Sequence, residues 1–426
     1  MHSLLPGKPS NLEKKLFKQY KTLKLILLGL IYIAFISLGL PDSLLGGSWP
    51  VMQPEIGAPK DLAGYVFMVI SIGTIISSLF SSRLIKHFGT GRITAFSVVM
   101  TAMALLGFHF ATSPSWLFVW AIPLGLGAGS IDAGLNEFVA EHYASRHMNW
   151  LHSFWGLGAM TGPLLLAGLI TEGKSWRDAY LAVAIIQFVL SLILFISLPL
   201  WRKVEKQDAV YQQMEQPVQS DSQVKGGIRS ALKTKGVLQV LLSVFFYTGI
   251  EQTLILWGAT YLIASHQINA ATASAWISFY LIGITAGRFL SGILTVKFSN
   301  QIMIRAGQLL ILFGLVLLLL PLPPVFQLTG ILLAGLGCAP VFPCILHETP
   351  VRFGKENAQE IMGFQMAVAY SGSTLIPPII GSIGTRTTMF VIPFAALIFS
   401  VLMLLVSEQA NSIFSERKTA EIHQVF

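Results

Sequence analysis

Three carboxylic acids stand in stretches of the sequence that are otherwise almost uncharged: Asp42, Asp132 and Glu251. An ionised carboxylate in apolar surroundings is unfavourable unless it is paired, hydrated or protonated. A carboxylic acid whose surroundings change can take up and release a proton, or it can bind a cation or a hydroxylated ligand. These three residues are therefore the first candidates for chemistry.

Asp42 follows Pro41 and precedes Gly46 and Gly47. Proline bends a helix and frees a backbone carbonyl, so an irregular helix is expected here. One interpretation makes Asp42 a proton-coupling residue that faces a central cavity. The alternative is an acid at a helix end, hydrated at the lipid headgroups.

Asp132 and Asn136 are one helical turn apart and therefore share a helix face. Together they offer a hydrogen-bond acceptor and an amide, which suits a ligand with several hydroxyl groups. We expect both to bind substrate. The alternative is a hydrogen bond that holds two packed helices together.

A second polar face contains Asn149 and His152, with Gly156 continuing it and Trp155 at its edge. An amide and a neutral imidazole can bind sugar hydroxyls, and an aromatic ring can stack on the apolar face of a hexose. Asn149 and His152 are therefore predicted to bind substrate. The alternative is a histidine satisfied at the membrane interface.

Glu251 lies near the middle of its apolar stretch, with Tyr247 one turn earlier and Gln252 beside it. Because no charged residue is close in sequence, Glu251 is predicted to face a polar cavity or to be protonated. It is a candidate for both proton coupling and substrate binding; the alternative is a buried, hydrogen-bonded acid. Gln252 and Trp257 join the predicted substrate site, although Trp257 lies about 120° round an ideal helix from Glu251.

The elements that position these residues follow from composition. The chain has 426 residues, of which 54% are hydrophobic and 11% charged, too few charges for a soluble protein of this size. Apolar runs of about 20 residues, each long enough to cross a bilayer as a helix, make this an all-α membrane protein. Its twelve expected transmembrane helices are Leu23–Gly47, Leu62–Ser82, Ile93–Thr112, Trp116–Ala140, Trp150–Ile170, Tyr180–Leu200, Val237–Ala264, Ser274–Val296, Ile302–Pro321, Phe326–His347, Ala358–Ile383 and Thr388–Val406.

The segment between the sixth and seventh helices, Trp201–Gly236, is rich in Lys, Arg, Gln, Ser and Glu and is interpreted as a partly disordered cytoplasmic linker. It divides the chain into six-helix bundles at 1–200 and 237–426. Lys and Arg gather in the loops on the side of the termini, which predicts that both termini are cytoplasmic. This orientation also explains the net charge of +8 without a nucleic-acid partner. Arg288, near the cytoplasmic end of the eighth helix, is expected to extend its side chain to the interface.

Short patterns recur in the two halves at offsets of 210 to 214 positions, which is typical of a transporter built from two related bundles. The pairs are Gly125–Ala128 with Gly335–Cys338, Ser81–Phe88 with Ser291–Phe298, and Gly158 and Pro163 with Gly372 and Pro377.

This organisation resembles the major facilitator superfamily over the whole chain. Within it, several short motifs resemble the fucose permease type, the fucose/glucose/galactose:cation symporter group. They are Pro41–Leu45, Asp132–Asn136, Asn149–Gly156, Gly249–Glu251 with Trp257 and Tyr261, and Pro340–Pro343. The resemblance implies cation-coupled sugar symport and an acidic cavity residue at Asp132. One departure is Lys86, which stands near the place of an Asp in the superfamily's loop signature, so the cytoplasmic salt bridge made by that Asp is in doubt.

No catalytic, metal-binding or nucleotide-binding pattern occurs in the sequence, so we expect no enzyme, no metal and no cofactor. The sequence predicts a monomeric, multi-pass transporter of the cell membrane that carries a small neutral sugar with protons. The first alternative is a proton-driven exporter of lipophilic compounds or lipids, for which Met160, Met362 and Met366 would line the path. The second is a receptor or scaffold, whose expected soluble domain is missing.

Overall fold

The computed structural model describes residues 11–143, 145–215 and 234–425, and in this part of the chain it is helical with no strand. The first group of helices is α1 (Asn11–Asp42), α2 (Leu44–Glu55), α3 (Leu62–Phe88), α4 (Thr90–His109), α5 (Pro114–His142), α6 (Ser145–Thr171), α7 (Trp176–Ile196) and α8 (Leu198–Glu215). The second group is α10 (Val237–His266), α11 (Ala270–Leu294), α12 (Asn300–Leu319), α13 (Pro324–Phe353), α14 (Lys355–Arg386) and α15 (Val391–Val425).

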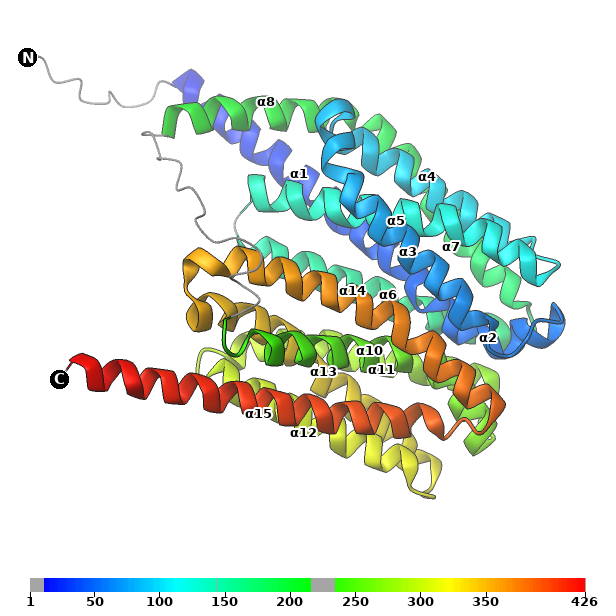
Figure 1. The fold of residues 1–426 in the computed structure, drawn as a ribbon. Coiled ribbons are helices and arrows are strands. Elements are labelled where there is room, and N and C mark those ends of the chain that lie inside the picture. The colour runs from blue at the N-terminus through cyan, green and yellow to red at the C-terminus, as the bar shows by residue number, and fades with distance from the viewer. Residues whose placement is uncertain (1–10, 144, 216–233, 426) are drawn as a thin grey trace, which may run out of the picture.

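Twelve helical stretches of the described residues are long and apolar enough to cross a membrane, which confirms the number expected from the sequence. The first of them, Tyr20–Glu55, consists of the part of α1 that begins at Tyr20, followed by α2. Residues 201–215 of the expected linker continue as helix α8, and residues 216–233 lie outside the described part. Figure 1 shows two bundles, with the start of α1 and the end of α15 on the same side of the molecule. We call this the terminal side and the opposite one the far side.

The break between α1 and α2 follows from Pro41, which has no N–H to donate to the carbonyl of Ser37. Gln187 Nε2 on α7 donates to that carbonyl instead, at 2.8 Å. Pro163 on α6 likewise cannot bond the carbonyl of Ala159, which accepts a hydrogen bond from Ser43 Oγ at 2.5 Å. Each proline thus leaves a buried acceptor that a neighbouring helix satisfies.

The sequence repeat has a structural counterpart in helix packing. A Cβ added to Gly125 would collide with the carbonyl of Ile70, and one added to Gly335 would collide with the carbonyl of Tyr280. Gly335 follows Gly125 by 210 positions, and Tyr280 follows Ile70 by the same number. The pair α3 and α5 therefore packs as α11 and α13 do, with glycine allowing backbone contact in each bundle.

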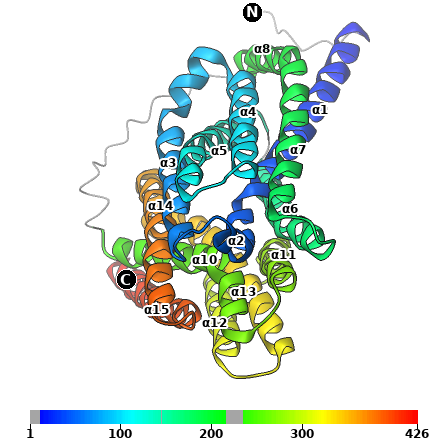
Figure 2. The same cartoon turned by 90° about the vertical axis from the view of Figure 1, so that its right-hand side faces the viewer.

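The two bundles touch through α6 with α11, α3 with α14, and α2 with α10 and α11. Viewed from the far side in Figure 2, α2 lies centrally beside α10 and α11. The contact there is close, because a Cβ on Gly46 would collide with the backbone of Ile255 and Leu256. Asp61 and Arg386 add an ion pair at 3.8 Å between the start of α3 and the end of α14. The bundles are therefore closed against each other on the far side.

Candidate functional site

A chain of polar and aromatic side chains runs from one bundle into the other. Trp155 Nε1 on α6 donates to Asp42 Oδ2 on α1 at 2.6 Å, and the Trp155 ring lies 5.8 Å from the Arg288 guanidinium carbon on α11. Arg288 Nη2 is 3.6 Å from Glu251 Oε1 on α10, which also accepts from the hydroxyl of Tyr247 at 3.1 Å. We call these five residues the cross-bundle network.

Close packing of α1 on α6 positions the first half of this network. A Cβ on Gly39 would collide with the carbonyl of Trp155, and one on Gly158 would collide with the carbonyl of Ile36. These glycines lie one turn from Asp42 and Trp155, so the two functional side chains meet where the backbones are closest. Asp42 is exposed and Trp155 half-buried, which leaves the carboxylate accessible to water or a ligand.

The second half of the network is more deeply buried. Glu251 is 7% exposed and Tyr247 is 1% exposed, and the Tyr247 ring stacks on Phe342 with 5.9 Å between centroids. A carboxylate this buried needs a counter-charge, which Arg288 supplies from 37 positions later in the sequence. The expectation that Arg288 extends to the interface is therefore wrong: its side chain is 19% exposed and faces the network.

Asp132 and Asn136 form a hydrogen-bonded pair on α5. Asn136 Nδ2 donates to Asp132 Oδ1 and to the Asp132 carbonyl, both at 2.9 Å, so the bond lies within one helix and does not join two helices. Asp132 interacts electrostatically with Asp42 and with Tyr370 on α14. Asn136 Oδ1 is buried without a hydrogen-bond partner among the described residues. The pair thus lies near the network and has an unused acceptor.

The other predicted site residues are placed differently. His152 is exposed, packs edge-on to Phe35 at 6.1 Å between ring centroids and interacts electrostatically with Arg288. Gln252 is half-buried on α10. The side chain of Asn149 lies outside the described residues.

Trp257 stands apart from this group. It is completely buried, and its Nε1 donates to the carbonyl of Pro377 at 2.8 Å. Its ring fills the space that a side chain at Gly381 would occupy, and it would lie in van der Waals contact, at 3.4 Å, with a Cβ added to Gly64 on α3. In this conformation Trp257 therefore packs in the far-side contact between the bundles.

Sequence reasoning missed two members of the network. The sequence puts Trp155 only at the edge of a polar face and predicts that Arg288 extends to the interface. A signal was present for Arg288, because an arginine within an apolar span without a sequence neighbour of opposite charge needs a partner from another helix.

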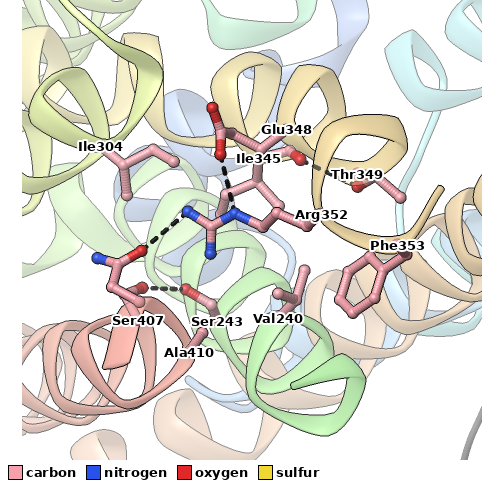
Figure 3. A pocket seen from close by; sticks show the side chains of 11 residues that line it. Val240, Ser243, Ile304, Ile345, Glu348, Thr349, Arg352, Phe353, Ser407 and Ala410 are labelled. Atoms are coloured by element: carbon pink, nitrogen blue, oxygen red, sulfur yellow. Dashed lines mark hydrogen bonds and ion pairs between the residues drawn. The ribbon is translucent and has the colours of Figure 1, made fainter. Parts of the chain in front are cut away.

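A separate polar cluster lies inside the second bundle (Figure 3). Arg352 Nε donates to Glu348 at 2.9 Å, Arg352 Nη2 donates to Asn411 at 2.8 Å, and Ser243 and Ser407 share a hydrogen bond of 2.7 Å. These groups line a cavity of about 20 Å³ between α10, α12, α13 and α15, which has room for about one water molecule. The cluster shares no residue with the cross-bundle network, and we interpret it as a structural link between four helices.

Comparison with known proteins agrees with this architecture. The family model described as Major Facilitator Superfamily matches residues 31–377 and 261–422. The glucose/mannose transporter GlcP of Bacillus subtilis is 26% identical over 375 residues, which cover 85% of this chain and 91% of that protein. Bypass of stop codon protein 6 of Saccharomyces cerevisiae is 23% identical over 420 residues, covering 91% of this chain and 83% of the relative.

The crystal structure of a mutant of the nucleoside transporter NupG superposes on this protein with a TM-score of 0.72 at 12% sequence identity. The superposition covers 90% of this chain and 98% of the NupG chain. At that identity the likeness concerns the fold. The family match, the twelve helices and the shared fold together show that the chain belongs to the Major Facilitator Superfamily and is a multi-pass membrane transporter.

Proposed function

We propose that this protein is a secondary active transporter that moves a small neutral sugar, a hexose or deoxyhexose, together with protons by alternating access. It works as a monomer in the cell membrane and needs no cofactor. The observation that carries the proposal is the cross-bundle network, which places an accessible carboxylate, an indole and a buried ion pair at the junction of the two bundles. The similarity to a glucose/mannose transporter supports the substrate class.

The charges of the site favour a neutral substrate. Arg288 is already engaged by Glu251, so it offers little uncommitted positive charge to an anion. Asp42, Asp132 and Asn136 supply acceptors and an amide, which suit hydroxyl groups. The half-buried ring of Trp155 provides an apolar surface for the face of a pyranose.

Alternating access follows from the arrangement of the bundles. If both termini are cytoplasmic, as the charge distribution predicts, the far side is extracellular and this conformation is closed to the outside. Rocking one bundle against the other would separate Asp61 from Arg386 and open the far side. The substrate and the proton would then reach the same residues from the opposite side of the membrane.

Asp42 is the proposed proton carrier, because it is exposed and because its bonded partner, the Trp155 indole, carries no charge that would hold it permanently ionised. Glu251 is a second coupling candidate. We assign it the smaller role, since Glu251 is buried and already paired with Arg288 and therefore exchanges protons with water less readily than the exposed Asp42.

The test is uptake of a panel of labelled sugars into liposomes that contain the purified protein, with and without an inward proton gradient. We expect at least one hexose or deoxyhexose to accumulate only when the gradient is present. Protein-free liposomes and a protonophore serve as controls. Absence of gradient-dependent uptake of every sugar, together with efflux of amphipathic dyes, would replace this proposal with the lipophilic exporter.

A further inference from the structure

The cross-bundle network joins the two bundles through one contact. Asp42 and Trp155 belong to the first bundle, and Arg288, Glu251 and Tyr247 belong to the second. Within the network, only the contact of the Trp155 ring with the Arg288 guanidinium crosses the junction. Any motion that separates α6 from α11 at this level must therefore break or rebuild that contact.

Both sides of this contact are held in place by a charged group. The Trp155 indole is oriented by its hydrogen bond to Asp42, and the Arg288 guanidinium is oriented by Glu251, which Tyr247 fixes in turn. A hydrogen bond to an ionised carboxylate is roughly twice as strong as one to a neutral group. The orientation of Trp155 thus depends on whether Asp42 is ionised.

Arg288 is suited to change partners. Its Nε is buried and makes no hydrogen bond to any described residue, so one donor of its planar fork is unused in this conformation. A guanidinium stacks on an indole face through charge and planarity together, and the ammonium of lysine cannot reproduce that geometry.

We propose that Trp155 and Arg288 form a latch that reports the protonation of Asp42 to the second bundle. Ionised Asp42 holds the indole against Arg288 and favours the conformation closed on the far side. Protonated Asp42 accepts a weaker hydrogen bond, the indole turns away, and the bundles separate more readily on the far side. By linkage, the conformation with the latch closed binds the proton less well and so releases it on the terminal side.

The inference rests on the proposed function for its biological meaning, but the conformational equilibrium can be measured without any sugar. The titratable and charged groups that bear on the latch are Asp42, Asp132, His152, Tyr370, Glu251, Tyr247, Tyr280, Cys338 and Arg288. Asp42→Asn distinguishes the effect of Asp42 on the pH response from the effects of the other groups, because this variant should behave like protein with a protonated Asp42 at every pH.

The experiment places spin labels on cysteines at Lys60 and Thr388, on either side of the far-side contact, and measures their separation by pulsed EPR between pH 5.5 and 8. We expect acidification to decrease the far-side-closed population of the otherwise unmodified protein. A cation–π contact of ordinary strength corresponds to a change of about 2- to 30-fold in the population ratio. Asp61→Asn, made in the same labelled protein, controls for titration of the far-side ion pair.

Trp155→Phe keeps an aromatic ring and loses the indole donor, so it should abolish the response to pH while the protein remains folded. Arg288→Lys keeps the charge but loses the planar guanidinium, so the response to pH should be smaller than in the unmodified protein. The matched control is Trp201→Phe, which removes an indole hydrogen bond of 3.2 Å to the hydroxyl of Ser197, a group that does not titrate. It should respond as the unmodified protein does.

The proposal is overturned if Trp155→Phe responds to pH like the unmodified protein, or if the unmodified protein shows no response. Sugar uptake with an intact response in Trp155→Phe would contradict the latch alone. A response that depends on Trp155, found in a protein that transports no sugar, would contradict the proposed substrate alone.

Discussion

Asp42 and Glu251 are both carboxylic acids of the cross-bundle network, yet their surroundings differ. Asp42 is exposed and bonded to a neutral indole, whereas Glu251 is buried and paired with Arg288. An exposed acid can exchange protons with water directly, while a buried acid beside a guanidinium is shielded from water and held by its partner. At the residue scale, we therefore assign exchange of the proton to Asp42 and orientation of Arg288 to Glu251.

Asp42→Asn is expected to abolish accumulation of sugar against its gradient and to preserve exchange of sugar between loaded vesicles and the medium. The amide still accepts a hydrogen bond from Trp155 but cannot ionise, so the substrate site remains and the coupling is lost. Both processes are measured in the same liposomes with labelled sugar. Full proton-driven accumulation by this variant would make Glu251 or Asp132 the next candidate.

Alanine at Asn136 or Asn149 is expected to weaken sugar binding. Removing a group that hydrogen-bonds a sugar hydroxyl costs about 1 to 3 kcal/mol, which corresponds to roughly 5- to 150-fold in affinity. Calorimetry with the identified sugar measures the change in protein whose thermal unfolding is unaltered. The site assignment is wrong if both variants, properly folded, bind with unchanged affinity.

At the scale of elements, glycines decide where helices approach each other. Gly158 on α6 contacts the backbone of α1, whereas Gly168 on the same helix has nothing within 4 Å of its added Cβ. The two positions therefore form a matched pair for testing whether the contact between α1 and α6 positions Asp42 against Trp155.

Gly158→Ala should force α1 and α6 apart and lower stability by about 1 to 3 kcal/mol, as overpacking does. Gly168→Ala should be neutral or slightly stabilising, because alanine favours a helix by up to about 1 kcal/mol over glycine. Thermal unfolding in detergent compares the two variants. Equal melting temperatures would show that the packing at Gly158 does not hold the helices as described.

The twelve helices and several local pairs could be predicted because they depend on residues close in sequence. Long apolar runs identify spans, and one-turn spacing brings Asn136 to Asp132 and Tyr247 to Glu251. The contact of Trp155 with Arg288 could not be predicted, because it joins helices from different bundles. Its geometry depends on how the bundles pack, which neither charge nor periodicity specifies.

At the scale of the whole molecule, the charge distribution predicts which side faces the cytoplasm. Single cysteines at Lys60, Lys174 and Arg386 should react with an impermeant reagent added to intact cells, because these residues belong to loops predicted to be extracellular. Cysteines at Lys86, Arg229 and Lys355 should react only after the membrane is permeabilised. Labelling of position 229 in sealed cells would reverse the orientation and, with it, the proposed direction of opening.

The most direct test of the central claim is movement of protons driven by the sugar itself. Liposomes that contain the protein and hold no proton gradient are placed in a weakly buffered medium, and the external pH is followed while the identified sugar is added. We predict that the medium becomes more alkaline as sugar and protons enter together, that a protonophore abolishes the signal, and that Asp42→Asn gives none. Sugar entry at the normal rate without any change in external pH would contradict proton-coupled symport.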